Sequence, residues 1–324
     1  MDIKASIKHI NLLVSNRCNL KCKMCDYHME ASARQELSLD DITCLIAEAA
    51  ALGLERIELS GGEPMLRKDI YQIIEFAKSL NIRSLLVTNG TLIGEIEAEK
   101  LVSSGISAVI ISLEGPEDIN DFIRGKGSFR KALNAIISLK KYRENLDYIN
   151  VGITVSKVNS KHLYEFTRYL IEEAGVDSIS YNPFDREMLW EENYAGVKDI
   201  FTITPDLNKD LKHELQKIID YGKDKKINLS PDYFLHKFCD YFDGKSIKPV
   251  FPCCEPITGC AIKASGEVFA CWGQQNIPVG NIATSSFKTI IESEKYIDAC
   301  KNGLTLKCGG CLKACYVSIH SNTF

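Results

Sequence analysis

Hydrophobic residues along the first two hundred positions follow two alternating periods. Six short runs with a high density of Val, Ile and Leu indicate strands of a parallel sheet that is buried on both faces. They span residues 10–14, 56–60, 84–88, 108–112, 149–155 and 178–182. Between them, apolar residues recur every three or four positions, which is typical of one face of a helix. This alternation predicts six consecutive βα units.

The predicted helices have recognisable starts and apolar faces. Ser38 with Asp41 three positions later forms a capping-box pattern ahead of the first helix. Further helices are predicted over residues 70–80, 95–104, 128–142, 160–174 and 207–218, and a last strand over residues 227–234. Six βα units predict a partial (β/α)6 barrel of the TIM type, in which chemistry gathers at the carboxyl ends of the strands.

Composition and charge exclude several classes of function. The chain has 324 residues, of which 45% are hydrophobic, so it can bury a core without disulfides or structural metals. Its net charge is -4 and its longest basic runs are lysine pairs, which argues against nucleic acid as a partner. The first residues lack the apolar stretch of a signal peptide, and no run is long enough to span a membrane. We therefore expect a cytoplasmic protein.

Thirteen cysteines are unusual for a cytoplasmic protein, because reducing conditions leave metal binding or catalysis as their usual roles. Cys18, Cys22 and Cys25 form a C-x3-C-x2-C array directly after the first predicted strand. A 4Fe-4S cluster needs four ligands, so three thiolates leave one iron open to a ligand that carries an amine and a carboxylate. Cysteine spacing alone also allows half of a zinc site.

This array resembles the cysteine loop of the radical S-adenosylmethionine (radical SAM) superfamily. A Gly-Gly-Glu-Pro element at residues 61–64 ends the second strand, as it does in that family. The resemblance implies a first 4Fe-4S cluster on the three cysteines and S-adenosylmethionine as its ligand. Glu63 would pair with the methionyl ammonium, Arg124 with the carboxylate and Ser112 with the ribose. The implied cofactor contacts are Gly61, Gly62, Glu63, Asn89, Ser112 and Arg124. The family's usual aromatic residue before the third cysteine is Met24 in this chain.

A second cysteine-rich region begins near residue 249. Its spacing resembles the SPASM and Twitch extensions of radical SAM enzymes, which carry auxiliary 4Fe-4S clusters and a small hairpin, expected here at residues 264–270. Two spacings of a full SPASM pattern are missing, so the resemblance implies one auxiliary 4Fe-4S cluster. One ligand set is Cys254, Cys260, Cys271 and Cys315, and a rival set is Cys260, Cys271, Cys308 and Cys311. A zinc ribbon is the alternative.

The resulting organisation has three parts. Residues 1–204 are expected to form the barrel, residues 205–248 a connecting segment that faces the substrate, and residues 249–324 the iron-sulfur domain. The resemblance implies reductive cleavage of S-adenosylmethionine to a 5'-deoxyadenosyl radical, which abstracts hydrogen from a substrate carbon. An electron donor of the flavodoxin or ferredoxin type is implied as well.

Two outcomes for the substrate radical stay open. An auxiliary cluster could accept an electron, which gives oxidation or cross-linking. Alternatively, the thiol of Cys239 could return a hydrogen atom, which gives epimerisation, although a buried and inert cysteine is the alternative reading. The family acts on ribosomal peptides and on aminoglycoside-like small molecules. The chain begins almost at its first strand, which favours a small molecule or short peptide. A non-catalytic iron-sulfur or zinc-binding interaction protein is the competing class, but it has no use for the Gly-Gly-Glu element.

Overall fold

One curved ten-stranded sheet organises the chain. The computed structural model describes residues 3–27, 35–184, 199–245, 247, 253–274, 277–307 and 312. The strand order is β10-β9-β8-β1-β2-β3-β4-β5-β6-β7, and strands β8 and β1 to β7 run parallel. The strands are β1 (His9–Ser15), β2 (Arg56–Gly61), β3 (Arg83–Thr88), β4 (Ala108–Ser112), β5 (Tyr148–Val155), β6 (Ser178–Pro183), β7 (Asn228–Leu229), β8 (Gly259–Ile262), β9 (Glu267–Phe269) and β10 (Gly280–Asn281).

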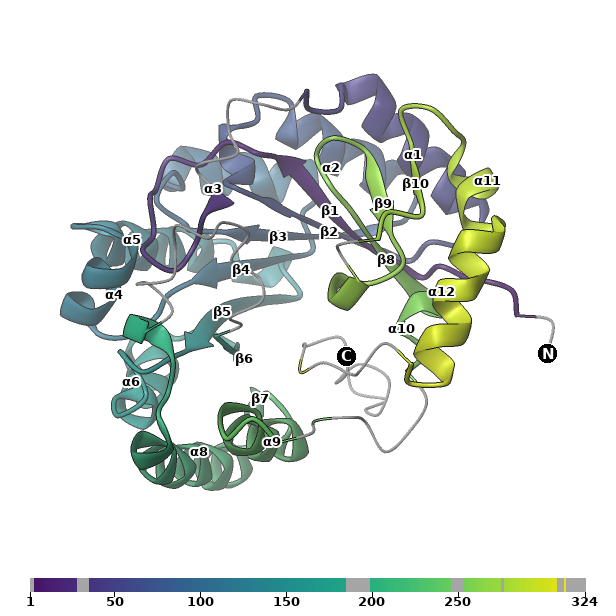
Figure 1. Ribbon diagram of the computed structural model, residues 1–324. Coiled ribbons are helices and arrows are strands. Elements are labelled where there is room, and N and C mark those ends of the chain that lie inside the picture. Colours follow the sequence, from purple (N-terminus) through teal and green to yellow (C-terminus); the bar gives the residue numbers. More distant parts are fainter. Residues whose placement is uncertain are drawn as a thin grey trace.

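Helices cover the convex side of this sheet (Figure 1). The barrel helices are α1 (Leu39–Ala51), α2 (Ile70–Ser79), α3 (Glu95–Ser104), α4 (Glu117–Arg124), α5 (Ser128–Lys140) and α6 (Leu163–Tyr169), continued by the π-helical turn η4 (Leu170–Ala174). The later helices are α8 (Pro205–Lys225), α9 (Asp232–Phe242), α10 (Glu255–Thr258), α11 (Phe287–Ile291) and α12 (Glu294–Leu304). Short 3-10 turns are η2 (Pro64–Leu66), η3 (Arg143–Asn145) and η7 (Trp272–Gln274). The predicted partial (β/α)6 barrel is confirmed, and the capping box of Ser38 and Asp41 begins α1.

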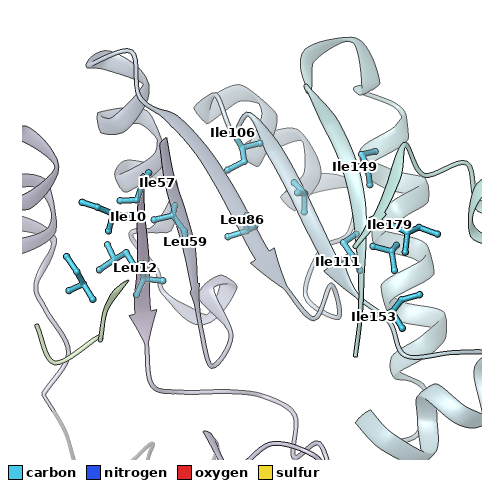
Figure 2. Close-up of a cluster of buried hydrophobic side chains, with 14 of the residues drawn as sticks. Ile10, Leu12, Ile57, Leu59, Leu86, Ile106, Ile111, Ile149, Ile153 and Ile179 are labelled. Carbon is cyan, nitrogen blue, oxygen red and sulfur yellow. The ribbon is translucent and has the colours of Figure 1, made fainter. Parts of the chain in front are cut away.

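The core lies between the sheet and the outer helices. Figure 2 shows its central side chains, among them Ile10, Leu12, Ile57, Leu59 and Leu86. Successive residues of a strand point to opposite faces, so the residues between these face the concave side. That side is polar along β5 and β6. Asn150 Nδ2 donates to Ser178 Oγ at 2.8 Å, and Ser180 Oγ donates to Asn150 Oδ1 at 2.9 Å.

Two local predictions were wrong in extent. The strand expected at residues 227–234 is only the two-residue β7, because Pro231 precedes a helix in which Phe234, Leu235 and Phe238 recur at helical spacing and are buried. Burial of the strands by apolar residues on both faces is correct only in part, for example in β1, where Leu12, Leu13 and Val14 are all buried. In β2 buried and partly exposed positions alternate, since the concave side of an open barrel stays accessible.

The carboxyl-terminal region continues the barrel sheet. β8 pairs in parallel with β1, in a register that sets His9 beside Gly259 and Leu12 beside Ile262. β8 and β9 form the expected hairpin, which begins earlier than predicted because its turn lies at residues 263–266. In the part of the chain that the structure describes, no helix combines the length and apolar character that crossing a membrane requires.

Candidate functional site

The cysteine loop crosses the carboxyl ends of the strands and is held at three points. At its start, Ser15 Oγ donates to Glu36 Oε1 at 2.7 Å. In its middle, Asn89 Nδ2 donates to Asn19 Oδ1 at 2.9 Å, which ties the loop to the end of β3. Near its end, Lys23 N donates to Ile123 O of α4 at 2.8 Å. The loop that carries Cys18, Cys22 and Cys25 is therefore fixed to the barrel rim along its length.

Gly61 and Gly62 let the end of β2 lie against this loop. Gly62 N donates to Ser15 O at 2.8 Å, and a Cβ at Gly62 would stand 2.3 Å from Arg17 O. Gly61 has φ +129°, and its Cβ would stand 2.3 Å from Ser15 O. No side chain fits at either position without moving backbone. These two glycines therefore allow the backbone of the cysteine loop to lie directly against the end of β2.

Alanine at position 62 is expected to displace the loop and prevent cluster assembly there. We expect Gly62→Ala to lose the iron bound by that loop, which is about four irons per chain, and to lose S-adenosylmethionine cleavage. Iron analysis of the anaerobically reconstituted protein measures this. Gly152→Ala is the matched control, because its Cβ would meet Ile110 Cγ2 at an ordinary 3.5 Å. Equal iron contents in the two variants would contradict the steric argument.

Glu63 is fully buried and joins the ends of β2 and β3. Its Oε1 accepts from Thr88 Oγ1 at 2.7 Å and from Met65 N at 3.0 Å, and its Oε2 accepts from Asn89 N at 2.8 Å. Burial raises the pKa of the Glu63 carboxyl, and these three hydrogen bonds oppose that effect. The carboxylate therefore fixes the Asn89 loop, which in turn holds Asn19 of the cysteine loop.

Arg124 and Glu114 form an ion pair inside the rim. Arg124 Nε and Nη2 donate to Glu114 Oε1 at 2.9 and 2.5 Å, and Glu114 Oε2 accepts from Thr154 N at 2.7 Å. The side chain of Glu114 is 0% exposed and that of Arg124 is 13% exposed. Within the described residues Arg124 Nη1 donates to no other group, so one edge of the guanidinium is available to a carboxylate.

The three thiols share Arg124 as a charged neighbour. Burial raises the pKa of Cys18, Cys22 and Cys25, to about 11 for Cys25, and the positive charge of Arg124 lowers all three. Iron binding to this loop therefore displaces thiol protons. In the described part of the chain, no three His, Cys, Asp or Glu side chains converge as a single metal ion requires. A cluster does not need that convergence, since each cysteine binds a different iron. Three thiols on one fixed loop beside a guanidinium fit a 4Fe-4S cluster whose open iron takes an anionic ligand.

Two other predicted site residues lie in different places. Ser112 ends β4 on the concave side, in register with Gly152 of β5. Cys239 lies on α9, where its thiol donates to Asn208 O of α8 at 3.9 Å. The charges that influence the pKa of Cys239 come from α8, α9 and the residues that follow α9, namely Lys212, Asp240, Asp243 and Lys245. The structure therefore brings Ser112 to the rim and does not bring Cys239 to it.

Three described cysteines of the second region gather near α12. Cys254 precedes α10, Cys260 lies on β8, and Cys271 follows β9. The buried hydroxyl of Tyr296 donates to Gly259 O at 3.2 Å, and the neighbouring thiols of Cys260 and Cys271 add to the burial that raises its pKa. Cys308, Cys311 and Cys315 lie outside the described residues, so both ligand sets remain predictions.

Three residues of this arrangement were missed by sequence reasoning. Glu36 anchors the start of the cysteine loop, and Glu114 orients Arg124. Cys300 of α12 is fully buried, also neighbours Tyr296, and donates to Pro256 O at 3.1 Å. A single acidic residue or cysteine gives no spacing signal.

Comparison with known protein families agrees with this geometry. The family model described as the Radical SAM superfamily matches residues 12–170, and the SPASM model, an iron-sulfur cluster-binding domain, matches residues 253–315. The chain carries a radical SAM domain and a SPASM domain. Its radical SAM and SPASM domains imply 4Fe-4S clusters and S-adenosylmethionine as cofactors. The expected match to a SPASM-type extension is confirmed.

Radical SAM relatives with assigned names include two tetrapyrrole enzymes. Fe-coproporphyrin III synthase of Methanosarcina barkeri is 35% identical over 164 residues, which cover 49% of this chain and 40% of that protein. The AdoMet-dependent heme synthase of the same organism is 29% identical over 313 residues, which cover 91% of this chain and 85% of that protein. Streptococcus suis SuiB bound to precursor peptide SuiA has the same fold, with a TM-score of 0.70 and 17% identity over 92% of this chain and 68% of SuiB.

Proposed function

We propose that this protein is a radical SAM enzyme that oxidises an organic substrate at an unactivated carbon. When bound, a reduced cluster held by Cys18, Cys22 and Cys25 and S-adenosylmethionine would supply a 5'-deoxyadenosyl radical for removal of a hydrogen atom from the substrate. Completing the oxidation would require loss of one electron to an auxiliary cluster and of one proton to solvent. One observation carries the proposal. Arg124, held by a buried carboxylate, is close enough to all three thiols of the cysteine loop and to Glu63 for its positive charge to lower their pKa values.

The rim residues have positioning roles in this proposal. Glu114 accepts hydrogen bonds from two nitrogens of Arg124 and so fixes the plane of the guanidinium group. The remaining edge of the guanidinium can then pair with the methionyl carboxylate in a defined orientation. Glu63 accepts three hydrogen bonds, and the remaining lone pair of Oε2 is the position from which it could accept from an ammonium. Ser112 on the concave side is proposed to contact the ribose.

Oxidation is favoured over epimerisation by the position of Cys239. A hydrogen donor for epimerisation must face the substrate carbon, whereas this thiol lies against Asn208 in the contact of α8 with α9. Burial also raises the pKa of Cys239, as expected for an inert packed thiol. The competing alternative of a non-catalytic cluster protein does not account for a carboxylate that holds Arg124 next to the cysteine loop.

The substrate that we propose is a polar small molecule or a short peptide. On the concave face Ser180 is partly exposed, and its hydroxyl suits a substrate that forms hydrogen bonds. The SuiB complex with its precursor peptide is consistent with a peptide. A tetrapyrrole is the second candidate, because the AdoMet-dependent heme synthase aligns with 91% of this chain. We place the enzyme in the cytoplasm, where reductants for both clusters are available.

Mass analysis of products formed in deuterated water tests this proposal. The anaerobic reactions contain S-adenosylmethionine, dithionite and one of three candidates, namely any short peptide found encoded beside the gene, an aminoglycoside or Fe-coproporphyrin. We expect one candidate to lose two hydrogens and to retain no solvent deuterium. Gain of one deuterium without other change would instead indicate epimerisation.

The matched variant is Cys239→Ala, which we expect to form product at the wild-type rate. Its side chain contacts backbone of α8 rather than the rim, so removal of the sulfur leaves the proposed site unchanged. Loss of product with continued 5'-deoxyadenosine formation in this variant would assign Cys239 the donor role and contradict oxidation.

A further inference from the structure

The outer surface of the cysteine loop carries a row of charges that the proposed site does not use. Exposure alternates from residue 17 to residue 24, with odd positions exposed and even positions partly or fully buried. Every charged side chain in this stretch is a cation. Arg17 precedes Cys18, and Lys21 and Lys23 flank Cys22. We refer to Arg17, Lys21 and Lys23 as the cationic stripe.

The charge of the stripe is only partly neutralised by neighbours. Arg17 Nη2 lies 3.5 Å from Glu36 Oε2, which is a long contact for an ion pair. Within the described residues no carboxylate forms an ion pair with Lys21 or Lys23. The Nζ of Lys23 instead lies 3.3 Å from the centroid of the Phe122 ring, and Phe122 is 45% exposed. Among the residues that the structure describes, the stripe thus combines two lysines that form no ion pair with an exposed aromatic side chain, on a chain whose net charge is -4.

A groove of about 430 Å³ continues this surface at one end of the stripe. Arg17 and Lys68 lie on its wall, and Lys68 is exposed. The groove also contains Asp69, which pairs with Arg67 at 2.7 Å, and Glu36, which pairs with Arg17. Since each acid has a basic partner, Lys68 adds its charge to that of the stripe.

We propose that the cationic stripe, with Phe122, is the docking surface for a small acidic protein that carries single electrons. Arg17 is adjacent in sequence to Cys18, and Lys21 and Lys23 are adjacent to Cys22. Because consecutive Cα atoms are about 3.8 Å apart, a partner bound to the stripe lies one residue of backbone away from these cysteines. Complementary charge accelerates such encounters, and an exposed aromatic residue supplies a desolvated contact at their centre. This inference rests on the proposed function, because one electron must leave the carrier and enter the cluster of this loop.

Charge reversal separates docking from chemistry. In the double variant Lys21→Glu/Lys23→Glu we expect binding of a reduced acidic ferredoxin, measured by calorimetry, to weaken by about tenfold or more at low salt. Ferredoxin-driven 5'-deoxyadenosine formation should slow by a similar factor. The difference should shrink in about 1 M NaCl, where the screening length falls to roughly 3 Å. Dithionite-driven formation and iron content should equal those of the wild type.

The matched control is Lys288→Glu/Lys295→Glu, which makes the same change of charge on exposed residues of α11 and α12. If ferredoxin binding weakens equally in both double variants, the effect comes from the net charge of the protein rather than from the stripe, and the proposal is overturned. If 5'-deoxyadenosine formation slows with dithionite as well as with ferredoxin, the lysines affect the cluster itself rather than docking, and the proposal is also overturned. Wild-type protein that cleaves no S-adenosylmethionine even with dithionite would contradict the proposed function itself.

Discussion

Simultaneous replacement of Cys18, Cys22 and Cys25 by alanine is expected to abolish 5'-deoxyadenosine formation and to leave about four irons per chain. The loss follows because these are the three thiols of the cysteine loop, which we propose as the protein ligands of its cluster. The residual iron follows because Cys254, Cys260 and Cys271 lie in a separate region at α10, β8 and β9. Iron and sulfide analysis of the anaerobically reconstituted variant, together with its electron paramagnetic resonance spectrum, measures both effects.

The control for this prediction is Cys44→Ala. Cys44 is exposed on α1, so the variant should keep full iron content and wild-type cleavage of S-adenosylmethionine. A triple variant that holds no iron would contradict the auxiliary cluster. A triple variant that holds zinc in stoichiometric amount after purification would favour a zinc ribbon at the second region.

Arg124→Met is expected to destabilise the fold as well as abolish activity. The carboxylate of Glu114 is 0% exposed, so removal of its partner leaves a buried charge, and breaking such a pair costs about 3–5 kcal/mol. For a chain of this length the melting temperature should fall by roughly 4–8 °C. Thermal unfolding of the reconstituted protein, with 5'-deoxyadenosine assayed in parallel, measures the two losses.

The double variant Arg124→Met/Glu114→Gln separates these two effects. Without the charge of Glu114, most of the lost melting temperature should return, whereas S-adenosylmethionine cleavage should stay absent because no guanidinium pairs with the methionyl carboxylate. Recovery of cleavage together with stability would mean that Arg124 acts only as a structural partner of Glu114.

Much of the barrel was predictable because its signals are local. The strands at residues 56–60 and 108–112 and the capping box of Ser38 follow from periodicity and from hydrogen bonds between close neighbours in sequence. The segment after residue 227 was less predictable. Its apolar residues fit a strand or a helix equally, and burial of Phe234 and Leu235 on one helical face decides for the helix.

The sequence by itself identified the cysteine loop and the Gly-Gly-Glu element of the proposed site. Cys18, Cys22 and Cys25 stand seven positions or fewer apart, and the Gly-Gly-Glu element follows a strand, so motif and position suffice to place both at the barrel rim. Parallel strands bring their carboxyl ends to one edge whatever the details of packing.

Only the tertiary structure decided how these residues are held. The glycines proved to accommodate backbone of the cysteine loop, Glu114 proved to orient Arg124, and Cys239 proved to face α8. Each of these relations joins segments that are separate in sequence, and no local pattern specifies which buried groups will meet. The alternation of exposed and buried residues along the cysteine loop also depends on contacts between distant segments, because the contacts of the loop with the ends of β2, β3 and α4 fix which of its residues are buried.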